Sequence, residues 1–165
     1  MPQTYVKKVL DARIYDLALE TPVDKAPLLS QRLKNQVLLK REDLQPVFSF
    51  KLRGAYNKLR HLSKKQLAAG VIAASAGNHA QGLALAAQKM GVKATIVMPK
   101  TTPRIKVDAV RGWGANVVLF GDNYDTAASH ANQLLKEQGL TYIHPFDDHD
   151  IIAGQGTVGL SLIHI

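Results

Sequence analysis

The chain of 165 residues contains no cysteine. Disulfide bonds, cysteine-ligated zinc and a cysteine nucleophile are therefore excluded. The sequence also lacks a run of about 18 uncharged apolar residues, the length a membrane-spanning helix needs, and an N-terminal apolar stretch of signal-peptide length. Aromatic residues make up only 6% of the chain, too few for a platform on which nucleic acid bases stack. These absences predict a cytoplasmic globular protein without a membrane partner.

Acidic residues are also scarce relative to basic ones, 13 against 21, which gives a net charge of +8. An excess of this size attracts nucleic acid by releasing counterions. The basic residues, however, lie in separated pairs such as Lys7–Lys8, Lys40–Arg41 and Lys64–Lys65. We therefore expect solvated basic faces on an enzyme that handles anions, with no nucleic acid partner. A basic nucleic-acid-binding module is the alternative from another class.

Short apolar segments alternate with helical periodicity through most of the chain. Strands are predicted at 71–74, 94–98, 116–120 and 141–143, and the helices between and before them at 51–62, 78–90, 103–111 and 124–138. Alternation of this kind is typical of parallel βαβ units. The predicted fold class is α/β, a parallel twisted sheet with helices on both faces. Nearer the N-terminus the pattern predicts an amphipathic helix at 5–19, a short helix at 28–33, a buried strand at 37–40 and a polar loop at 41–46.

One lysine has apolar neighbours, and a turn of small polar residues follows two dozen positions later. Lys51 lies between Phe50 and Leu52. Partial desolvation makes such a lysine available as an amine nucleophile toward an aldehyde. The turn comes directly after the predicted strand 71–74 and opens a helix, so its N–H groups suit a carboxylate or phosphate. Its residues are Ser75, Ala76, Gly77, Asn78 and His79.

Ligands gather at the carboxyl ends of parallel strands. We therefore expect Lys51 and the turn 75–79 to face one cleft between two subdomains.

Five segments in register closely resemble biosynthetic threonine dehydratase (threonine ammonia-lyase), a family of pyridoxal-phosphate enzymes with the tryptophan-synthase-β-like fold. The segments are 40–43, 49–56, 75–82, 105–112 and 153–157, and the resemblance runs from about Tyr5 to Val158. It implies deamination of L-threonine, with L-serine as a minor substrate, to 2-oxobutanoate and ammonia. This reaction leads into isoleucine biosynthesis. The resemblance further implies pyridoxal 5'-phosphate as cofactor and a homo-oligomer, a tetramer, for the full-length protein.

The resemblance also assigns roles to residues. Lys51 forms the imine with the cofactor and removes the α-proton of the substrate. Asn78 hydrogen-bonds the phenolic oxygen of the cofactor, and Phe50 packs beside its ring. The turn from Ser75 to His79 holds the substrate carboxylate. No metal is implied.

Simpler interpretations stand beside these roles. Asn78 suits a helix N-cap, which is compatible with a cofactor contact. We expect His79 to cap or pack, and Arg53 to form a structural ion pair. Residues 154–159 have the G-x-G-x-x-G spacing of dinucleotide-binding proteins, but no acidic residue follows about 20 positions later, so we interpret the match as accidental. The acidic and histidine-rich residues 144–150 are expected to form a solvated loop.

Members of this family bind the cofactor phosphate with a glycine-rich loop, which is expected well after the position of Thr157. This chain has no run of glycines. We therefore expect an inactive N-terminal fragment. Residues 1–48 belong to the larger catalytic subdomain, 49–150 form the smaller α/β subdomain, and 151–165 begin the return to the larger one. The tail 161–165 departs from the family, in which a glutamate usually stands near Ser161. A serine dehydratase, a serine racemase, the catabolic threonine enzyme and a non-catalytic relative remain alternatives.

Overall fold

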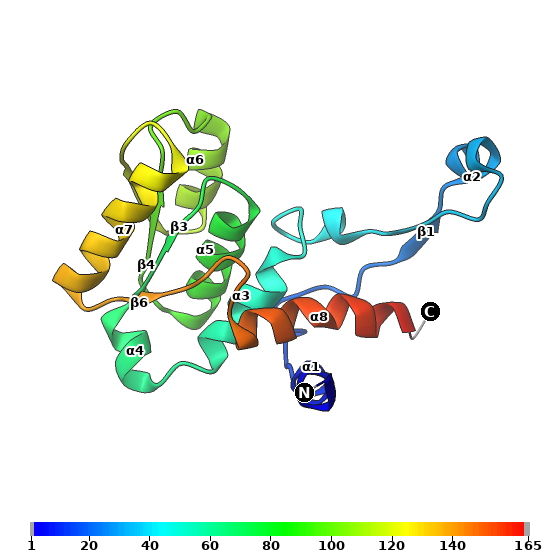
Figure 1. Ribbon diagram of the computed structural model, residues 1–165, viewed down its shortest axis with the longest axis horizontal. Coiled ribbons are helices and arrows are strands. Elements are labelled where there is room, and N and C mark those ends of the chain that lie inside the picture. Colours follow the sequence, from blue (N-terminus) through cyan, green and yellow to red (C-terminus); the bar gives the residue numbers. More distant parts are fainter. Residues whose placement is uncertain (1, 164–165) are drawn as a thin grey trace.

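The computed structural model describes residues 2–163 and consists of an α/β body with a long arm projecting from it (Figure 1). The body contains α3 (Lys51–Arg60), α4 (Lys64–Ala69), β3 (Val71–Ala74), α5 (Asn78–Met90), β4 (Ala94–Met98), α6 (Arg104–Gly112), β5 (Asn116–Leu119), α7 (Tyr124–Gln138) and β6 (Thr141–Tyr142). The arm contains β1 (Val23–Lys25), α2 (Pro27–Leu33) and β2 (Leu38–Lys40). Three elements lie beside the body: α1 (Pro2–Leu10), η1 (Glu42–Leu44) and α8 (His149–Ile163).

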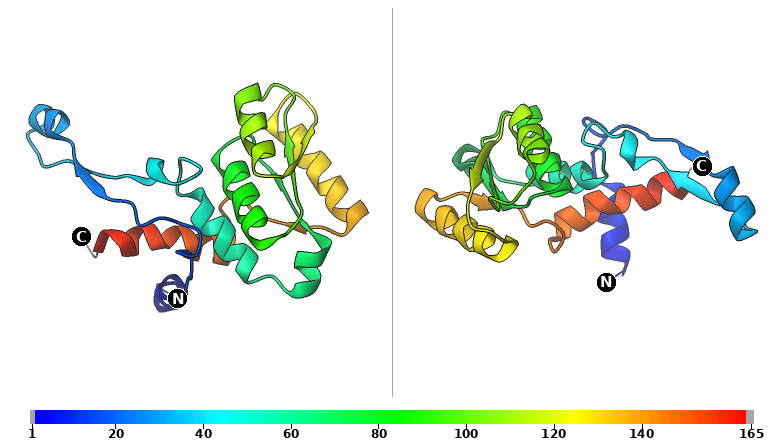
Figure 2. Two further views of the ribbon diagram at one scale, coloured as in Figure 1. Left: turned by 180° about the vertical axis from the view of Figure 1, so that it is seen from behind. Right: turned by 90° about the horizontal axis from the view of Figure 1, so that it is seen from above.

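The body is built on a four-stranded parallel sheet in the order β5-β4-β3-β6. Successive side chains of a strand point to opposite faces. On β3, Val71 and Ala73 therefore pack with α5 and α6, whereas Ile72 and Ala74 pack with Ala127 and its neighbours on α7. Helices cover both faces of the sheet, as the views of Figure 2 show. The predicted α/β fold class is confirmed.

The predicted strand boundaries hold for β3 and β4, and the predicted helix boundaries hold for α5 and α7. Gly91 and Gly139 end these two helices in the left-handed conformation, with φ of 67° and 65°. Only glycine adopts this conformation without a steric cost, so the sequence marks both helix ends clearly.

The predicted helix 5–19 is wrong in its extent, because α1 ends at Leu10. Ile14 and Ala18 belong to a buried cluster with Val47, Leu52 and Leu85. The apolar residues of α1 and those of the cluster around Ile14 pack in different places, but together their spacing in the sequence matches that of one long helix.

The strand predicted at 37–40 is also wrong in its burial. It pairs with β1 in a two-stranded sheet, and Leu38 and Leu39 are exposed. Three features were not predicted from the sequence: β1, α4 and the start of α8 at His149, which falls in the segment interpreted as a loop. In the tail, residues up to 163 continue α8, and Ser161 accepts a hydrogen bond from Lys40 Nζ at 2.8 Å, while 164–165 lie outside the described residues.

Helix α3 is the centre of the packing, because α5 lies against one side of it and α8 against another. Both contacts depend on glycine. A Cβ added to Gly82 of α5 would lie 2.8 Å from Leu52 N, and one added to Gly154 of α8 would lie 2.6 Å from Arg53 O. The backbones therefore approach too closely for any side chain. These contacts fix the position of the first turn of α3, which carries Lys51.

Candidate active site

Lys51 is the first residue of α3, and its side chain is half-buried. Its Nζ donates a hydrogen bond to the Pro145 carbonyl at 2.9 Å and lies 5.5 Å from the centroid of the Phe50 ring. Phe48, three residues before the helix, has a φ of 55°. A bulky residue rarely adopts this conformation, so the turn that delivers the chain to Lys51 is strained.

The turn 75–79 lies at the carboxyl end of β3, where parallel sheets bind ligands. Gly77, not Asn78, is the N-cap of α5, and no side chain caps the helix. A Cβ added to Gly77 would meet nothing within 4 Å, so the space before the helix is open. Uncapped N–H groups and the positive end of the helix dipole face that space, which suits an anion.

The structure brings this turn close to Lys51. The backbones of Gly82 and Lys51 nearly touch, since a Cβ on Gly82 would lie 2.9 Å from the Lys51 carbonyl carbon. Asn78 lies four residues before Gly82 and therefore on the same face of α5. Asn78 is exposed. The predicted lysine and the predicted turn therefore lie at adjoining helix starts.

A third segment, the connection from β6 to α8, joins them. The buried His79 donates from Nε2 to the Ile143 carbonyl at 3.0 Å, two residues before the Pro145 carbonyl that accepts from Lys51. Burial, above all, lowers the pKa of His79 to about 4, with smaller contributions from Lys51 and His144 nearby. His79 is therefore neutral at pH 7, with its proton on Nε2. Its Nδ1 is buried and has no partner among the described residues.

This third segment was not predicted from the sequence, because its contribution is made by backbone carbonyls, which any residue supplies. His144 shapes the segment by accepting hydrogen bonds from the N–H groups of Phe146 and Asp147, at 3.2 and 2.7 Å. The sequence feature that could have pointed to this segment is a histidine followed directly by a proline, His144–Pro145, in a polar stretch.

Arg53 forms the structural ion pair that the sequence predicts. It is fully buried, and its Nε lies 2.7 Å from Glu42 Oε2. Burial alone would raise the pKa of Glu42, but hydrogen bonds from Arg53 and Thr21 hold it below its ordinary value. Glu42 lies in the stretch predicted as a polar loop, and its burial was not predicted.

Two other motifs are placed away from this site. Residues 154–159 lie inside α8, not on a turn between a strand and a helix, so the dinucleotide interpretation is excluded. Among residues 2–163, no group of three or more histidine or acidic side chains is arranged to hold a metal ion. None of the helices in the described part of the chain is both long and apolar enough to cross a bilayer.

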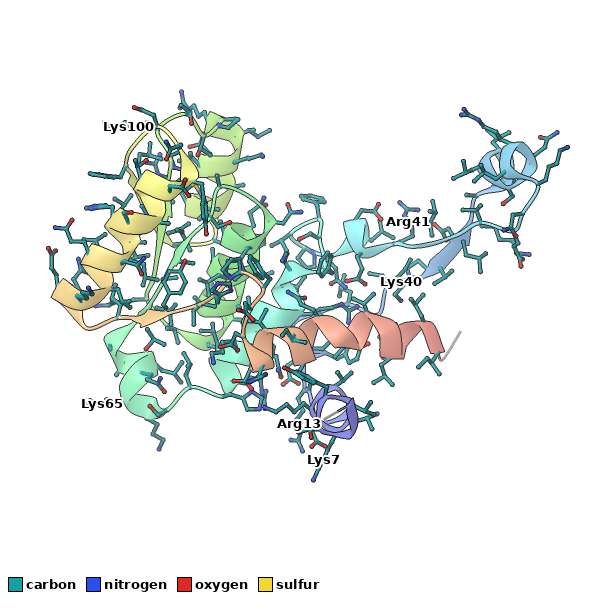
Figure 3. The ribbon with its side chains drawn as sticks, in the orientation of Figure 1. Lys7, Arg13, Lys40, Arg41, Lys65 and Lys100 are labelled. Carbon is teal, nitrogen blue, oxygen red and sulfur yellow. The ribbon has the colours of Figure 1, made fainter. Side chains whose placement is uncertain are left out.

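The basic side chains are spread over separate parts of the surface. Figure 3 shows Lys7 and Arg13 near α1, Lys40 and Arg41 on the arm, and Lys65 on α4. Lys100 lies at the opposite end of the body from α4. The charge pairs therefore do not form one continuous patch, and the nucleic acid alternative gains no support.

The parallel α/β body brings a lysine amine, an aromatic ring and an uncapped helix start together, an arrangement that suits a ligand carrying an aldehyde and an anionic group. Residues 14–164 match the family of pyridoxal-phosphate dependent enzymes, and the chain belongs to this family. The chain is 58% identical to "L-threonine dehydratase biosynthetic IlvA" of Burkholderia multivorans, covering 96% of this chain and 32% of that protein. It is 59% identical to "Threonine dehydratase biosynthetic, chloroplastic" of Arabidopsis thaliana, covering 96% and 27%.

Solved structures agree. The processed form of threonine deaminase isoform 2 from Solanum lycopersicum superposes with a TM-score of 0.93 at 53% identity, covering 98% of this chain and 47% of that one. Maize serine racemase gives a TM-score of 0.92 at 32% identity, covering 96% and 49%. The chain thus spans between a quarter and a third of the length of these curated relatives and about half of these solved chains.

The residues present fit pyridoxal phosphate at its aldehyde and its ring. The amine of Lys51 suits the aldehyde, and the Phe50 ring, 5.5 Å from that amine, suits the flat face of the cofactor ring. The open, uncapped start of α5 suits an anionic group bound beside them. No two glycines are adjacent anywhere in the chain, so it holds no glycine run for the cofactor phosphate.

Proposed function

We propose that this chain is part of a pyridoxal-phosphate-dependent L-threonine dehydratase, which converts L-threonine to 2-oxobutanoate and ammonia and accepts L-serine as a minor substrate. The observation that carries the proposal is the position of the Lys51 amine, 2.9 Å from the Pro145 carbonyl and beside the open start of α5. Identities of 58% and 59% to enzymes named biosynthetic threonine dehydratase support this substrate over serine.

Lys51 binds the cofactor through its amine and afterwards carries the α-proton of the substrate. The hydrogen bond to the Pro145 carbonyl holds Nζ beside the connection from β6 to α8 before any ligand arrives. Bound cofactor supplies an electron sink for the charge that the departing proton leaves behind. Orientation of the reacting groups is the part that the protein contributes.

The turn 75–79 binds the substrate carboxylate with backbone N–H groups and small side chains. Gly77 N already donates to Ser75 Oγ at 3.3 Å, which shapes the turn. Asn78, exposed on the face of α5 toward Lys51, donates to the phenolic oxygen of the cofactor, and Phe50 packs beside its ring. Threonine differs from serine by one methyl group, which a pocket distinguishes by about 1–3 kcal/mol, so serine remains a minor substrate.

We also propose the division of the chain into residues 1–48 of a larger subdomain, 49–150 as a smaller subdomain and 151–165 as the return. The full-length protein is a cytoplasmic homotetramer that serves isoleucine biosynthesis. The low coverage of the relatives supports the view that the larger subdomain needs further sequence.

The test is borohydride reduction of the full-length protein loaded with pyridoxal phosphate, followed by peptide mapping. We expect the pyridoxyl label on Lys51, release of 2-oxobutanoate from L-threonine, and loss of both in Lys51→Ala. A label on another residue, or none, would refute the proposal. Formation of D-serine from L-serine as the main reaction would favour a racemase instead. The chain of 165 residues alone is expected to release no 2-oxobutanoate.

A further inference from the structure

Beneath the first turn of α3 lies a buried charge network that the proposed reaction does not use. Arg53 stands two residues after Lys51 and is fully buried. Its Nε and Nη2 donate to the two carboxylate oxygens of Glu42 at 2.7 and 2.8 Å, a bidentate pair. Bidentate geometry fixes the direction of the guanidinium as well as its distance.

The network connects α3 with segments distant in the chain. Glu42 also accepts from Thr21 Oγ1 at 2.6 Å and from Gln45 Nε2 at 3.2 Å. Arg53 Nη1 donates to Thr157 Oγ1 of α8 at 3.2 Å. The segment before the arm, η1 and α8 are therefore all tied to one side chain of α3.

Stability alone does not account for this arrangement. Removing two charges from water costs about as much as their attraction returns, and apolar residues of similar volume often stabilise a protein equally well. An apolar pair does not fix the direction in which its side chains point, whereas bidentate hydrogen bonds do. The pair therefore suits a role in fixing orientation.

The first turn of α3 is held by two kinds of contact. Gly82 and Gly154 let the backbones of α5 and α8 approach it closely, and Leu52 packs in an apolar cluster with Leu85 of α5. Apolar contacts are non-directional, whereas the bidentate pair at Arg53 has a fixed direction. Residues two apart on a helix point about 200° from each other, so fixing Arg53 inward directs Lys51 outward.

We infer that the Arg53–Glu42 pair positions Lys51, by fixing the rotation of the first turn of α3 so that the amine faces Pro145 and the turn 75–79. This inference rests on the proposed function, in which Lys51 forms the imine. Arg53 and Glu42 are positioning residues that touch neither substrate nor cofactor.

The test compares the double variant R53M/E42L with wild type in the full-length protein. The double variant is expected to unfold near the wild-type midpoint, because it leaves no unpaired buried charge. Its rate of imine formation, followed by the visible absorbance of pyridoxal phosphate, is expected to fall about 10- to 100-fold, the effect of misplacing a reacting group by about 1 Å. Without cofactor, the rate of reductive methylation of Lys51, read by mass spectrometry, is expected to change as well.

Two further variants keep the test decisive. R53K retains the charge but not the bidentate geometry, so it should fold and still form the imine slowly. R60M/D16L removes the ion pair at the other end of α3, where Arg60 Nη1 lies 2.6 Å from Asp16, and should leave imine formation unchanged.

The outcomes separate the two proposals. Absence of a label on Lys51 in wild type refutes the proposed function. A label in wild type, with imine formation and methylation at the wild-type rate in a folded R53M/E42L, overturns the inference. If that variant does not fold, wild-type rates in R53K overturn it equally.

Discussion

Lowering the pH should destabilise the folded chain through one buried histidine. His79 is 4% exposed, and burial lowers its pKa from the ordinary value of 6.5 to about 4. At about 1.36 kcal/mol for each pKa unit, this difference corresponds to about 3 kcal/mol. That is a large part of the 5–15 kcal/mol by which typical domains are stable.

The sign follows from proton binding. Between pH 6.5 and about 4, unfolded His79 carries a proton that folded His79 does not, so the unfolding free energy falls as the pH falls. The contribution of His79 is fully present above pH 6.5 and is lost by about pH 4. Hydrogen bonds hold the carboxyl pKa values of Glu42 and Asp148 low despite burial, so their contributions begin to be lost only below the ordinary values of 4.5 and 3.8.

Urea denaturation at a series of pH values between 7 and 4 measures the effect. His79→Gln keeps a donor for the Ile143 carbonyl but does not titrate, so the fall in this range should shrink by about 3 kcal/mol. The same substitution at the exposed His149 should leave the fall in place. An equally steep fall in His79→Gln would show that other groups cause it and that the imidazole is not buried as described.

Three further substitutions test the glycine contacts and one helix cap, all by urea denaturation at pH 7. Gly82→Ala should destabilise by about 1–3 kcal/mol or more, because the added Cβ meets the backbone of Leu52 at 2.8 Å and backbone does not move aside. Gly159→Ala, in α8 with nothing within 4 Å of the added Cβ, should stabilise by about 0.5–1 kcal/mol, and equal effects at both glycines would refute the packing. Ser63→Ala removes a capping box with Gln66 and should cost about 1 kcal/mol; no loss would show that the cap contributes nothing.

The sequence predicted the region from 71 to 138 well because local and tertiary signals agree there. Each strand of the sheet interior is apolar on both faces, and each long helix ends at a glycine with positive φ. In residues 5–19 the two signals conflict. Ile14 and Leu17 of the predicted helical pattern pack in a cluster with Val47, far along the chain, so their spacing reports a tertiary contact and not a continuous helix. Sequence spacing alone cannot separate these two causes.

The residues of the candidate site were likewise predicted only in part. Lys51 and the turn 75–79 were predicted because their chemistry requires particular side chains, and topology places strand ends together. The contributions of the Ile143 and Pro145 carbonyls were not predicted, because any residue supplies a carbonyl. Glu42 was missed because a polar residue in a polar stretch resembles a surface residue.

The need for a carboxylate such as Glu42 can be inferred from the surroundings of Arg53. A buried arginine needs an acceptor of matching geometry, and Arg53 lies on a helix whose neighbouring positions Leu52, Gly54 and Ala55 are buried. The requirement for a carboxylate could thus be inferred, although its identity could not, because several acidic residues precede the helix. The path of the chain from η1 to α3, which includes the turn through Phe48, places Glu42 against Arg53. The residue type of a buried charge predicts that it needs a partner of opposite charge, and the path of the backbone determines which residue is that partner.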